Sequence, residues 1–133
     1  MANKYGNSSL AHLNTLHPNL AMVMLDALKT MDHSIIEGYR NEERQNELFD
    51  AGKSKLRYPD GKHNCMPSLA VDAIPYPVDW EDRERMTLFA GIVLGVASQF
   101  DIAIRWGGDW NGDGQVKDNK FDDLVHFELV GKQ

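Results

Sequence analysis

The stretch "DDLVHFEL" (residues 122–129) decides the fold, because apolar and ionisable side chains alternate along a run of strand length. In an extended chain, His126 and Glu128 point to one face, while Phe127 points to the other and can anchor the strand in a core. Ionisable groups beside a core are costly unless they are paired, hydrogen-bonded or bound to metal. The stretch therefore predicts a strand with chemically useful groups on one face and Asp123 where the chain enters it.

Outward from this strand, helices and strands are interleaved along the chain. Apolar residues recur at helical spacing in residues 18–31, and Asn41 can cap a helix that ends before Gly52. A longer helix is expected from Trp80 to about Phe100, capped by Asp79. Its core face is expected to comprise Leu88, Ile92, Gly95 and Val96. Further short strands are expected at residues 33–38, 68–76 and 102–107, with loops at residues 53–67 and 107–121.

These elements predict the fold class. The strands are few and short, so we expect an α+β fold in which helices pack on a small, mainly antiparallel sheet. A chain of 133 residues with 42% hydrophobic content is long enough for one real core. No linker or repeat divides it, so we expect a single domain over residues 1–133.

The charge and the chain ends limit the partners. The net charge is −6, and no dense cluster of Lys and Arg is visible, so nucleic acid is not expected as a partner. The N-terminus has no basic segment followed by an apolar run, so no signal peptide is expected. The longest apolar run is too short to span a bilayer. We expect a soluble, cytoplasmic protein that does not insert stably into membranes; a monomer is expected, although the sequence does not fix the oligomeric state.

Three residues far apart in the sequence suggest a metal site. His63 lies in a loop, Asp72 on the next strand and His126 on the last strand. Two imidazoles and one carboxylate are typical of catalytic zinc, and three protein ligands leave one position for water, whose pKa zinc lowers to about 7. Asp123 is then a candidate general base. Spacing alone leaves a structural role open for each residue, as for His33, which we expect in a loop.

The chain also resembles a known family. The segments "KHNCMPSLAVDAIPYPVDW", "RWGGDWNGDG" and "KFDDLVHFEL", with "TLHPNL" and "EGYRNEERQNELF" before them, are similar to zinc peptidases that cut peptidoglycan stem peptides. These include D-alanyl-D-alanine carboxypeptidases of the vancomycin-resistance type and phage L-alanyl-D-glutamate endopeptidases. The likeness runs from about Leu16 to Leu129 and is strongest to the small phage endolysins.

The resemblance implies a role for each site residue. The family signature carries His63, Asp72 and His126 over as zinc ligands and Asp123 as the catalytic acid/base. Arg40 falls where the family places an arginine that holds substrate. The chain departs from the signature between its first two ligands. Gly61 and Ser68 stand where the family has Ser and Gly, and the gap is two residues longer.

A second metal loop is suggested by "DWNGDGQVKDNKFDD". Asp109, Asn111 and Asp113, followed by Gly114, match the first half of an EF-hand calcium loop. Position 12, normally Glu, is Lys120, and flanking helices are missing. A turn rich in Gly and Asp is the alternative. Some phage relatives resemble this chain in carrying a calcium-responsive loop here, so we expect Ca²⁺ as a second ion.

Three functions stay open from the sequence. The first is a phage-type endolysin that hydrolyses the L-alanyl-D-glutamate bond with Zn²⁺, waits in the host cytoplasm and acts on peptidoglycan at lysis. The second is a D-alanyl-D-alanine carboxypeptidase. The third, from another class, is a calcium-binding interaction module without catalysis. Cys65 is expected to be a bystander, and Trp106 and Trp110 are candidates either for the cleft or for core packing.

Overall fold

A four-stranded antiparallel sheet organises the part of the chain that the computed structural model describes, residues 2–116 and 122–131. The strands are β1 (His33–Glu37), β2 (Ala70–Pro75), β3 (Ile104–Gly107) and β4 (Asp123–Leu129). They lie in the order β1-β2-β4-β3, and each neighbouring pair is antiparallel. The expected α+β fold with a small antiparallel sheet is confirmed, and the stretch at 122–129 supplies one of the two central strands.

The pairing of β2 with β4 separates polar from apolar side chains. Asp72 lies opposite His126, and Val71 lies opposite Phe127. Because side chains alternate along a strand, Asp72 and His126 share one face of the sheet, while Val71 and Phe127 share the other. Phe127 is completely buried. The alternation read from the sequence is therefore the alternation that divides core from site.

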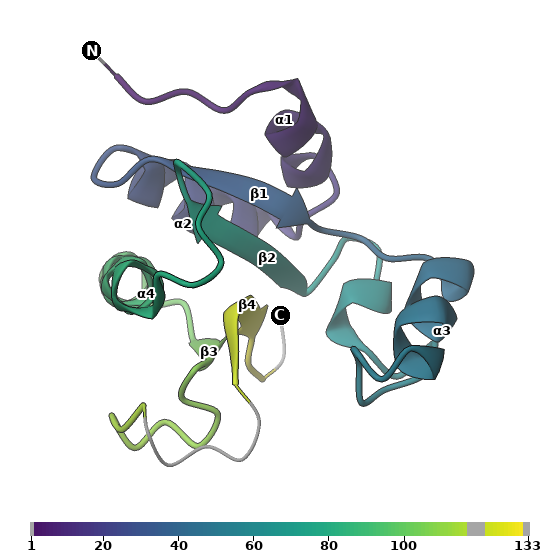
Figure 1. The fold of residues 1–133 in the computed structure, drawn as a ribbon. Helices are drawn as coiled ribbons and strands as arrows, with labels where there is room; N and C mark the ends of the chain where they lie inside the picture. The colour runs from purple at the N-terminus through teal and green to yellow at the C-terminus, as the bar shows by residue number, and fades with distance from the viewer. Residues whose placement is uncertain (1, 117–121, 132–133) are drawn as a thin grey trace.

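Two helices cover the apolar face. They are α2 (Pro18–Leu28) and α4 (Arg83–Gln99), and α4 contacts α2 and three of the strands. In Figure 1, α4 runs beside the sheet at the end that also carries β3. The side chains of α2 that reach the core are the expected ones: Leu20, Val23, Met24, Ala27 and Leu28. His17 caps this helix by accepting a hydrogen bond at Nδ1 from the Asn19 amide, 3.1 Å away.

The start of α4 differs from the prediction. The helix begins at Arg83, and the carboxylate of Asp82 caps it by accepting a hydrogen bond from the Arg85 amide at 3.1 Å. Asp79 accepts instead from the Glu81 amide, at 3.0 Å, in a local turn before the helix. Asp residues favour both turns and caps, and the predicted cap, Asp79, lies in the turn, so that prediction was wrong.

The buried face of α4 was predicted correctly only in part. The side chains against the core are Met86, Phe89, Ala90, Val93 and Ala97. Of the predicted face, Ile92 and Val96 are partly buried and pack against the core. Leu88 is 61% exposed, and Gly95 is also exposed. Apolar residues occur on several sides of this helix, so their spacing did not single out one face.

Helix α1 (Asn7–Leu13) was not expected and covers the edge of the sheet at β1. The Ser9 hydroxyl accepts a hydrogen bond from the Ile35 amide at 3.0 Å, which satisfies a backbone donor that an edge strand leaves unpaired. His33 also departs from expectation, because it lies inside β1, 2% exposed, and not in a loop.

The remaining helices lie beyond the ends of β1 and β2, away from α1, α2 and α4 (Figure 1). Helix α3 (Glu42–Asp50) begins after Asn41, whose side chain accepts from the Arg44 amide at 2.9 Å, as expected. A single 3₁₀ turn, η1 (Lys62–Asn64), interrupts the predicted loop at 53–67. Among the described helices, none is long and apolar enough to cross a membrane.

Candidate metal centre

Three donor atoms converge on one point of the polar face. The distances between His63 Nε2 and Asp72 Oδ1, between His63 Nε2 and His126 Nδ1, and between His126 Nδ1 and Asp72 Oδ1 are each 3.3 Å. All three side chains are buried, and among the described residues they form the one group of His, Cys, Asp and Glu whose donor atoms could hold a metal ion. The three residues that the sequence singled out as metal ligands therefore lie together in the structure.

The size of this triangle fits zinc. Zinc bonds of about 2.0–2.1 Å in a tetrahedron require ligand atoms roughly 3.3–3.4 Å apart. The three donor atoms lie at that separation. A donor set of two nitrogens and one oxygen also suits zinc better than it suits calcium or magnesium.

Each imidazole is oriented through its other nitrogen. His63 Nδ1 lies 2.7 Å from the Gly38 carbonyl oxygen, and His126 Nε2 lies 2.8 Å from Glu128 Oε1. Both partners are acceptors, so each outer nitrogen donates, and the inner nitrogen of the neutral ring is the one that would bind a metal. Glu128 therefore lies behind His126 and is not itself part of the donor group.

The elements that carry the ligands are locked together by backbone bonds. Asp72 and His126 face each other across β2 and β4. His63 comes from η1, whose carbonyl at residue 63 accepts from the Arg40 amide at 2.8 Å. The Asn64 side chain closes the turn by accepting from the Gly61 amide at 2.9 Å. The ligands therefore sit on rigid supports even though one of them was predicted to lie in a loop.

Charge balance in the cluster favours an ionised carboxylate between imidazoles. Burial alone would raise the pKa of Asp72, but the charges and hydrogen bonds of His63 and His126 hold it well below its usual range. Burial has the opposite effect on an imidazole and would lower the pKa of His126. Hydrogen bonds with Asp72 and Glu128 outweigh burial and raise this pKa to about 9. Since zinc needs the neutral ring, metal binding here displaces a proton.

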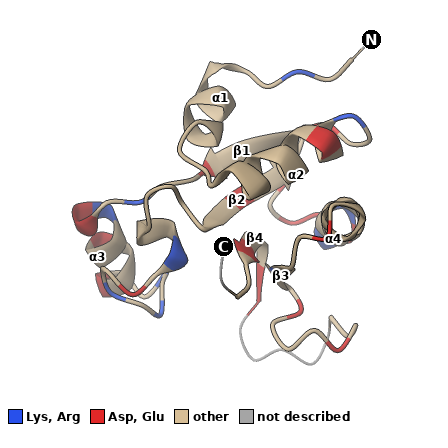
Figure 2. Ribbon diagram, turned by 180° about the vertical axis from the view of Figure 1, so that it is seen from behind, with Lys and Arg blue, Asp and Glu red and all other residues tan. Residues whose placement is uncertain are grey.

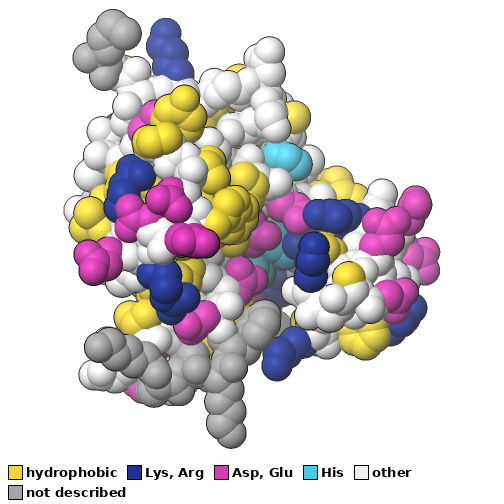
Figure 3. All heavy atoms as spheres, in the orientation of Figure 1, with side chains coloured by type: hydrophobic (Ala, Val, Ile, Leu, Met, Phe, Trp, Pro, Cys, Tyr) yellow, Lys and Arg dark blue, Asp and Glu magenta, His cyan; other side chains and the backbone are white. Residues whose placement is uncertain are grey.

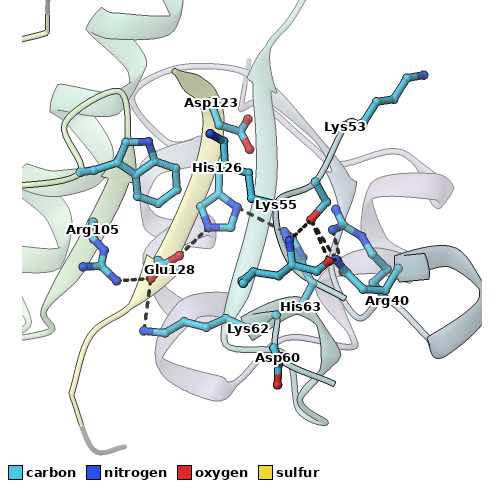
Figure 4. Close-up of a pocket in the computed structure, with 15 residues that line it drawn as sticks. Arg40, Lys53, Lys55, Asp60, Lys62, His63, Arg105, Asp123, His126 and Glu128 are labelled. Carbon is cyan, nitrogen blue, oxygen red and sulfur yellow. Dashed lines mark hydrogen bonds and ion pairs between the residues drawn. The ribbon is translucent and has the colours of Figure 1, made fainter. Parts of the chain in front are cut away.

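Asp123 lies at the start of β4 and lines the same pocket as His126 (Figure 4). Burial, and then the negative charge of Asp72, raise the pKa of Asp123, while His126, His63 and Arg40 oppose this in part. A carboxylate with a raised pKa is better suited to accept and return a proton near neutral pH. Its position depends on Gly107, because a Cβ at residue 107 would overlap the Asp123 backbone.

The site opens into a pocket of about 490 Å³. Figure 3 shows the hollow between the part that carries the sheet and the part that carries α3, with His and acidic side chains at its floor. Lys and Arg side chains lie on the α3 side of the hollow. A cavity of this size admits a short peptide segment but not a folded chain.

Arg40 lines this pocket but is held by several partners. Its Nε and one terminal nitrogen each lie 2.9 Å from an oxygen of Glu37, and the other terminal nitrogen lies 3.0 Å from Gln45 Oε1. A weaker contact of 3.6 Å reaches Asp72 Oδ2. The Glu37 pair fixes the guanidinium in a forked geometry beside the metal cluster.

Gln45 is a site residue that the sequence did not reveal. It is 1% exposed, and its amide nitrogen donates to the Ser54 hydroxyl at 2.9 Å and the Leu56 carbonyl at 2.6 Å. Its oxygen accepts from Arg40 and from Asn64. Gln45 therefore connects α3 to η1 and to the loop at residues 54–56, which we call the cleft loop. A single Gln in a polar helix carries no sequence signal for that role.

The two tryptophans that were candidates for the cleft or the core have different positions in the structure. Trp110 lines the pocket, and its ring lies 5.5 Å from that of His126. Trp106 is buried in the core and donates from Nε1 to the Leu124 carbonyl at 2.8 Å. Cys65 is exposed and does not belong to the donor group, as expected.

The loop with the calcium motif folds as a series of tight turns as far as residue 116. The Asp109 carboxylate accepts from the amides of Asp113 (3.2 Å) and Gly114 (2.9 Å), and Gly114 has a φ of +78°. Position 12 of the motif, Lys120, lies outside the described residues. The carboxylate two residues further on, Asp122, is paired with Arg83 at 2.7 Å. Calcium binding therefore stays a prediction.

A buried cluster of two imidazoles and one carboxylate could hold a metal ion at the floor of an open pocket, with a second carboxylate alongside. This arrangement is typical of hydrolases that use a single zinc ion. The comparisons with known proteins narrow that class. A model of the family described as phage L-alanyl-D-glutamate peptidase matches residues 1–130. The chain therefore belongs to the phage L-alanyl-D-glutamate peptidase family, as the resemblance indicated.

Individual relatives agree with this assignment. The chain is 30% identical over 139 residues to the L-alanyl-D-glutamate peptidase of Escherichia phage T5, an alignment that covers 98% of this chain and 100% of that protein. Its structure is similar to the crystal structure of the L-Ala D-Glu endopeptidase ChiX of Serratia marcescens, with a TM-score of 0.76 and 28% identity. That match covers 96% of this chain and 91% of the other.

Proposed function

We propose that this protein is a zinc-dependent endolysin peptidase that hydrolyses the L-alanyl-D-glutamate bond in the stem peptides of bacterial peptidoglycan. The observation that carries the proposal is the 3.3 Å triangle of His63, Asp72 and His126 donor atoms beside Asp123 in one pocket. Family membership and the names of both relatives support the choice of bond.

The residues divide the chemistry between them. His63, Asp72 and His126 would hold zinc, which when bound supplies a Lewis acid that polarises a carbonyl and lowers the pKa of water. Asp123 accepts the proton of the attacking water and delivers it to the leaving amine. Glu128 and the Gly38 carbonyl hold the imidazoles in the tautomer that this arrangement needs.

Arg40 is the proposed substrate-holding residue. It lines the pocket, and Glu37 fixes one edge of its guanidinium. One terminal nitrogen of Arg40 donates to the neutral Gln45. A substrate carboxylate would replace this partner at a lower cost in free energy than it would replace Glu37. Charge-assisted hydrogen bonds to a carboxylate are roughly twice as strong as bonds to a neutral amide oxygen.

Metal analysis combined with digestion tests the function. The purified protein should contain one zinc per chain and should release peptides with N-terminal D-glutamate from muropeptides. Chelation should stop the digestion, and added zinc should restore it. Release of free D-alanine instead would identify a D-alanyl-D-alanine carboxypeptidase, and absence of any cleavage by zinc-loaded protein would favour a non-catalytic binding module.

Calcium is proposed as a second ion, at Asp109, Asn111 and Asp113. The order of these residues in the sequence matches the first half of an EF-hand loop, and the Asp109 carboxylate closes a turn by accepting from the amides of Asp113 and Gly114. Because the loop precedes β4 in the sequence, calcium binding would be coupled to the strand that carries Asp123 and His126. Titration of calcium against hydrolysis and thermal stability tests this. If neither quantity responds to millimolar calcium, the loop is only a turn.

The biological setting is part of the same proposal. The whole chain, residues 1–133, would act as one monomeric peptidase domain on peptidoglycan. It would stay in the host cytoplasm until the membrane is opened at lysis. Expression in bacteria should leave cells intact until a membrane-permeabilising agent is added, and lysis without permeabilisation would contradict this order of events.

A further inference from the structure

Basic side chains gather around the pocket although the protein as a whole is acidic. Five of the 14 Lys and Arg residues line the pocket, against three of the 20 Asp and Glu residues. The basic residues are Arg40, Lys53, Lys55, Lys62 and Arg105. Figure 2 shows that acidic residues are spread over the molecule, on α3 and α4 among other elements. The pocket is therefore suited to a ligand that carries negative charge.

Two of these cations meet at Glu128, on the wall away from Arg40 (Figure 4). Glu128 Oε2 lies 2.7 Å from a terminal nitrogen of Arg105 and 3.3 Å from Lys62 Nζ, while Oε1 faces His126. One carboxylate therefore faces two fixed cations. Lys62 Nζ also donates to the Leu129 carbonyl, so its position is fixed by two partners.

Arg105 keeps donors that no acceptor among residues 2–116 and 122–131 uses. A guanidinium has five N–H donors. Among the described residues, Glu128 is the recorded partner of this guanidinium, and the Arg105 Nε is buried with no acceptor. The side chain is 41% exposed and lines the pocket, so its remaining terminal N–H groups can reach a ligand there. Cross-strand pairing of Arg105 with Glu128 fixes it on the sheet.

We propose that Arg105, supported by Lys62, is a specificity residue that binds a free carboxylate of the peptide segment beginning with D-glutamate. This rests on the proposed function. D-Glutamate has two carboxyl groups, and only one is used in the next amide bond, so the segment carries at least one free carboxylate. Arg40 and Arg105 lie on different walls of the pocket, and a peptide between them would meet a cation on each side.

A purely structural role for Arg105 makes a different prediction. If Arg105 serves only to hold Glu128, its loss would loosen His126 and weaken zinc binding, with equal effects on every substrate. If it binds substrate, its loss would raise KM for carboxylate-bearing peptides and leave zinc affinity unchanged. Comparison of an acid peptide with its amide separates the two roles.

The experiment measures kcat, KM and zinc affinity for the wild type, Arg105→Gln and Arg105→Lys on two peptides. One peptide carries the free carboxylates, and the other carries amides in their place. Arg105→Gln should raise KM for the acid peptide roughly tenfold to hundredfold, the range of a hydrogen bond between charged groups, with kcat and the amide peptide little changed. Arg105→Lys should fall between the two proteins because it keeps the charge but loses the fork.

The control is Arg57→Gln, which removes the same charge from an exposed ion pair with Asp50 outside the pocket. It should leave KM within about twofold of the wild type, as expected for surface pairs. Any of three results would overturn the proposal. Arg57→Gln could raise KM as much as Arg105→Gln does, Arg105→Gln could affect both peptides equally, or Arg105→Gln could bind zinc more weakly than the wild type.

Binding measurements separate this proposal from the proposed function. Calorimetry with the zinc-loaded Asp123→Asn protein measures affinity for the two peptides without cleavage. If the wild type cleaves no L-alanyl-D-glutamate bond, but the acid peptide still binds more tightly than the amide in a manner that depends on Arg105, the function fails and the subsite stands. If cleavage occurs without that preference, the subsite fails alone.

Discussion

At the scale of single residues, Asp123 carries the proton transfer on which hydrolysis depends. Asp123→Asn should lower kcat by roughly 10²- to 10⁴-fold, the usual contribution of a general base, while one zinc per chain stays bound. The measurement is kcat on a stem peptide together with metal content.

Asp122→Asn is a matched control for this prediction. Asp122 is the adjacent carboxylate, and its partner is Arg83 at the surface. Its loss should leave kcat within a few-fold of the wild type. If both variants lose activity equally, the segment as a whole, and not the carboxylate of Asp123, limits the reaction.

Glu128 should govern how tightly zinc is held. Hydrogen bonds from His126 and Arg105 overcome burial and lower the pKa of Glu128 to about 2, so its carboxylate stays ionised behind the imidazole. Glu128→Gln should weaken zinc binding by about 10- to 100-fold, the usual cost of losing such a partner. Competition with a chelator measures it. Glu47→Gln, at an exposed position of α3, should change nothing, and equal zinc affinity in both variants would contradict the role of Glu128.

At the scale of elements, the bulge between β3 and β4 places Asp123. The register shifts between Trp106 and Gly107, and Gly107 lies opposite Asp123. Gly107→Ala should push the Asp123 backbone away, reduce kcat at least tenfold and lower the free energy of unfolding by about 1–3 kcal/mol, as overpacking does. Activity assays and denaturant unfolding measure the two effects.

Gly91→Ala gives the comparison, because a Cβ at this position of α4 meets nothing within 4 Å. Ala favours a helix interior over Gly by up to about 1 kcal/mol, so this variant should be as stable as the wild type or more stable. Normal activity in Gly107→Ala would mean that the close approach of the two strands does not position the base.

Strand β1 should make folding sensitive to acid through His33. Burial lowers the pKa of His33, with partial opposition from the Met31 carbonyl and Asp32, so the folded protein resists a proton that the unfolded chain accepts near pH 6.5. The contribution of His33 is therefore fully present above that pH. As pH falls further it is lost, by up to about 1.4 kcal/mol per pH unit, until the folded pKa is reached.

Denaturant midpoints between pH 7.5 and 5 test this dependence. The wild type should lose more stability than His33→Gln over this range, so the difference between the two proteins should shrink as the pH falls. A constant difference would mean that His33 titrates normally in the folded protein, and an NMR titration of the ring gives an independent reading.

The elements also show what the sequence can predict. The alternation at His126 and Phe127, and the Asn41 cap, were readable because each rests on local spacing. Helix α1 was not, because most of its residues are polar and its role is to cover the edge of β1. The choice between Asp79 and Asp82 as a cap depends on how the preceding turn packs, which no local pattern contains.

At the scale of the whole molecule, the site depends on contacts across the fold. The three metal ligands were identified by donor type and family resemblance, but their convergence depends on the pairing of β2 with β4 and on the docking of η1. The partners of Arg40 and the role of Gln45 arise where α3 meets the cleft loop. The sequence therefore indicated the reactive groups, while the residues that orient them became apparent only in three dimensions.

X-ray absorption spectroscopy of the zinc-loaded protein tests the central claim most directly, because it reports the atoms bound to the metal. Two imidazole rings should be present, with nitrogen and oxygen neighbours at about 2.0–2.1 Å and no sulfur. His63→Ala or His126→Ala should each remove one imidazole from the spectrum. A sulfur neighbour at about 2.3 Å, or a spectrum with fewer than two imidazoles in the unchanged protein, would contradict the site.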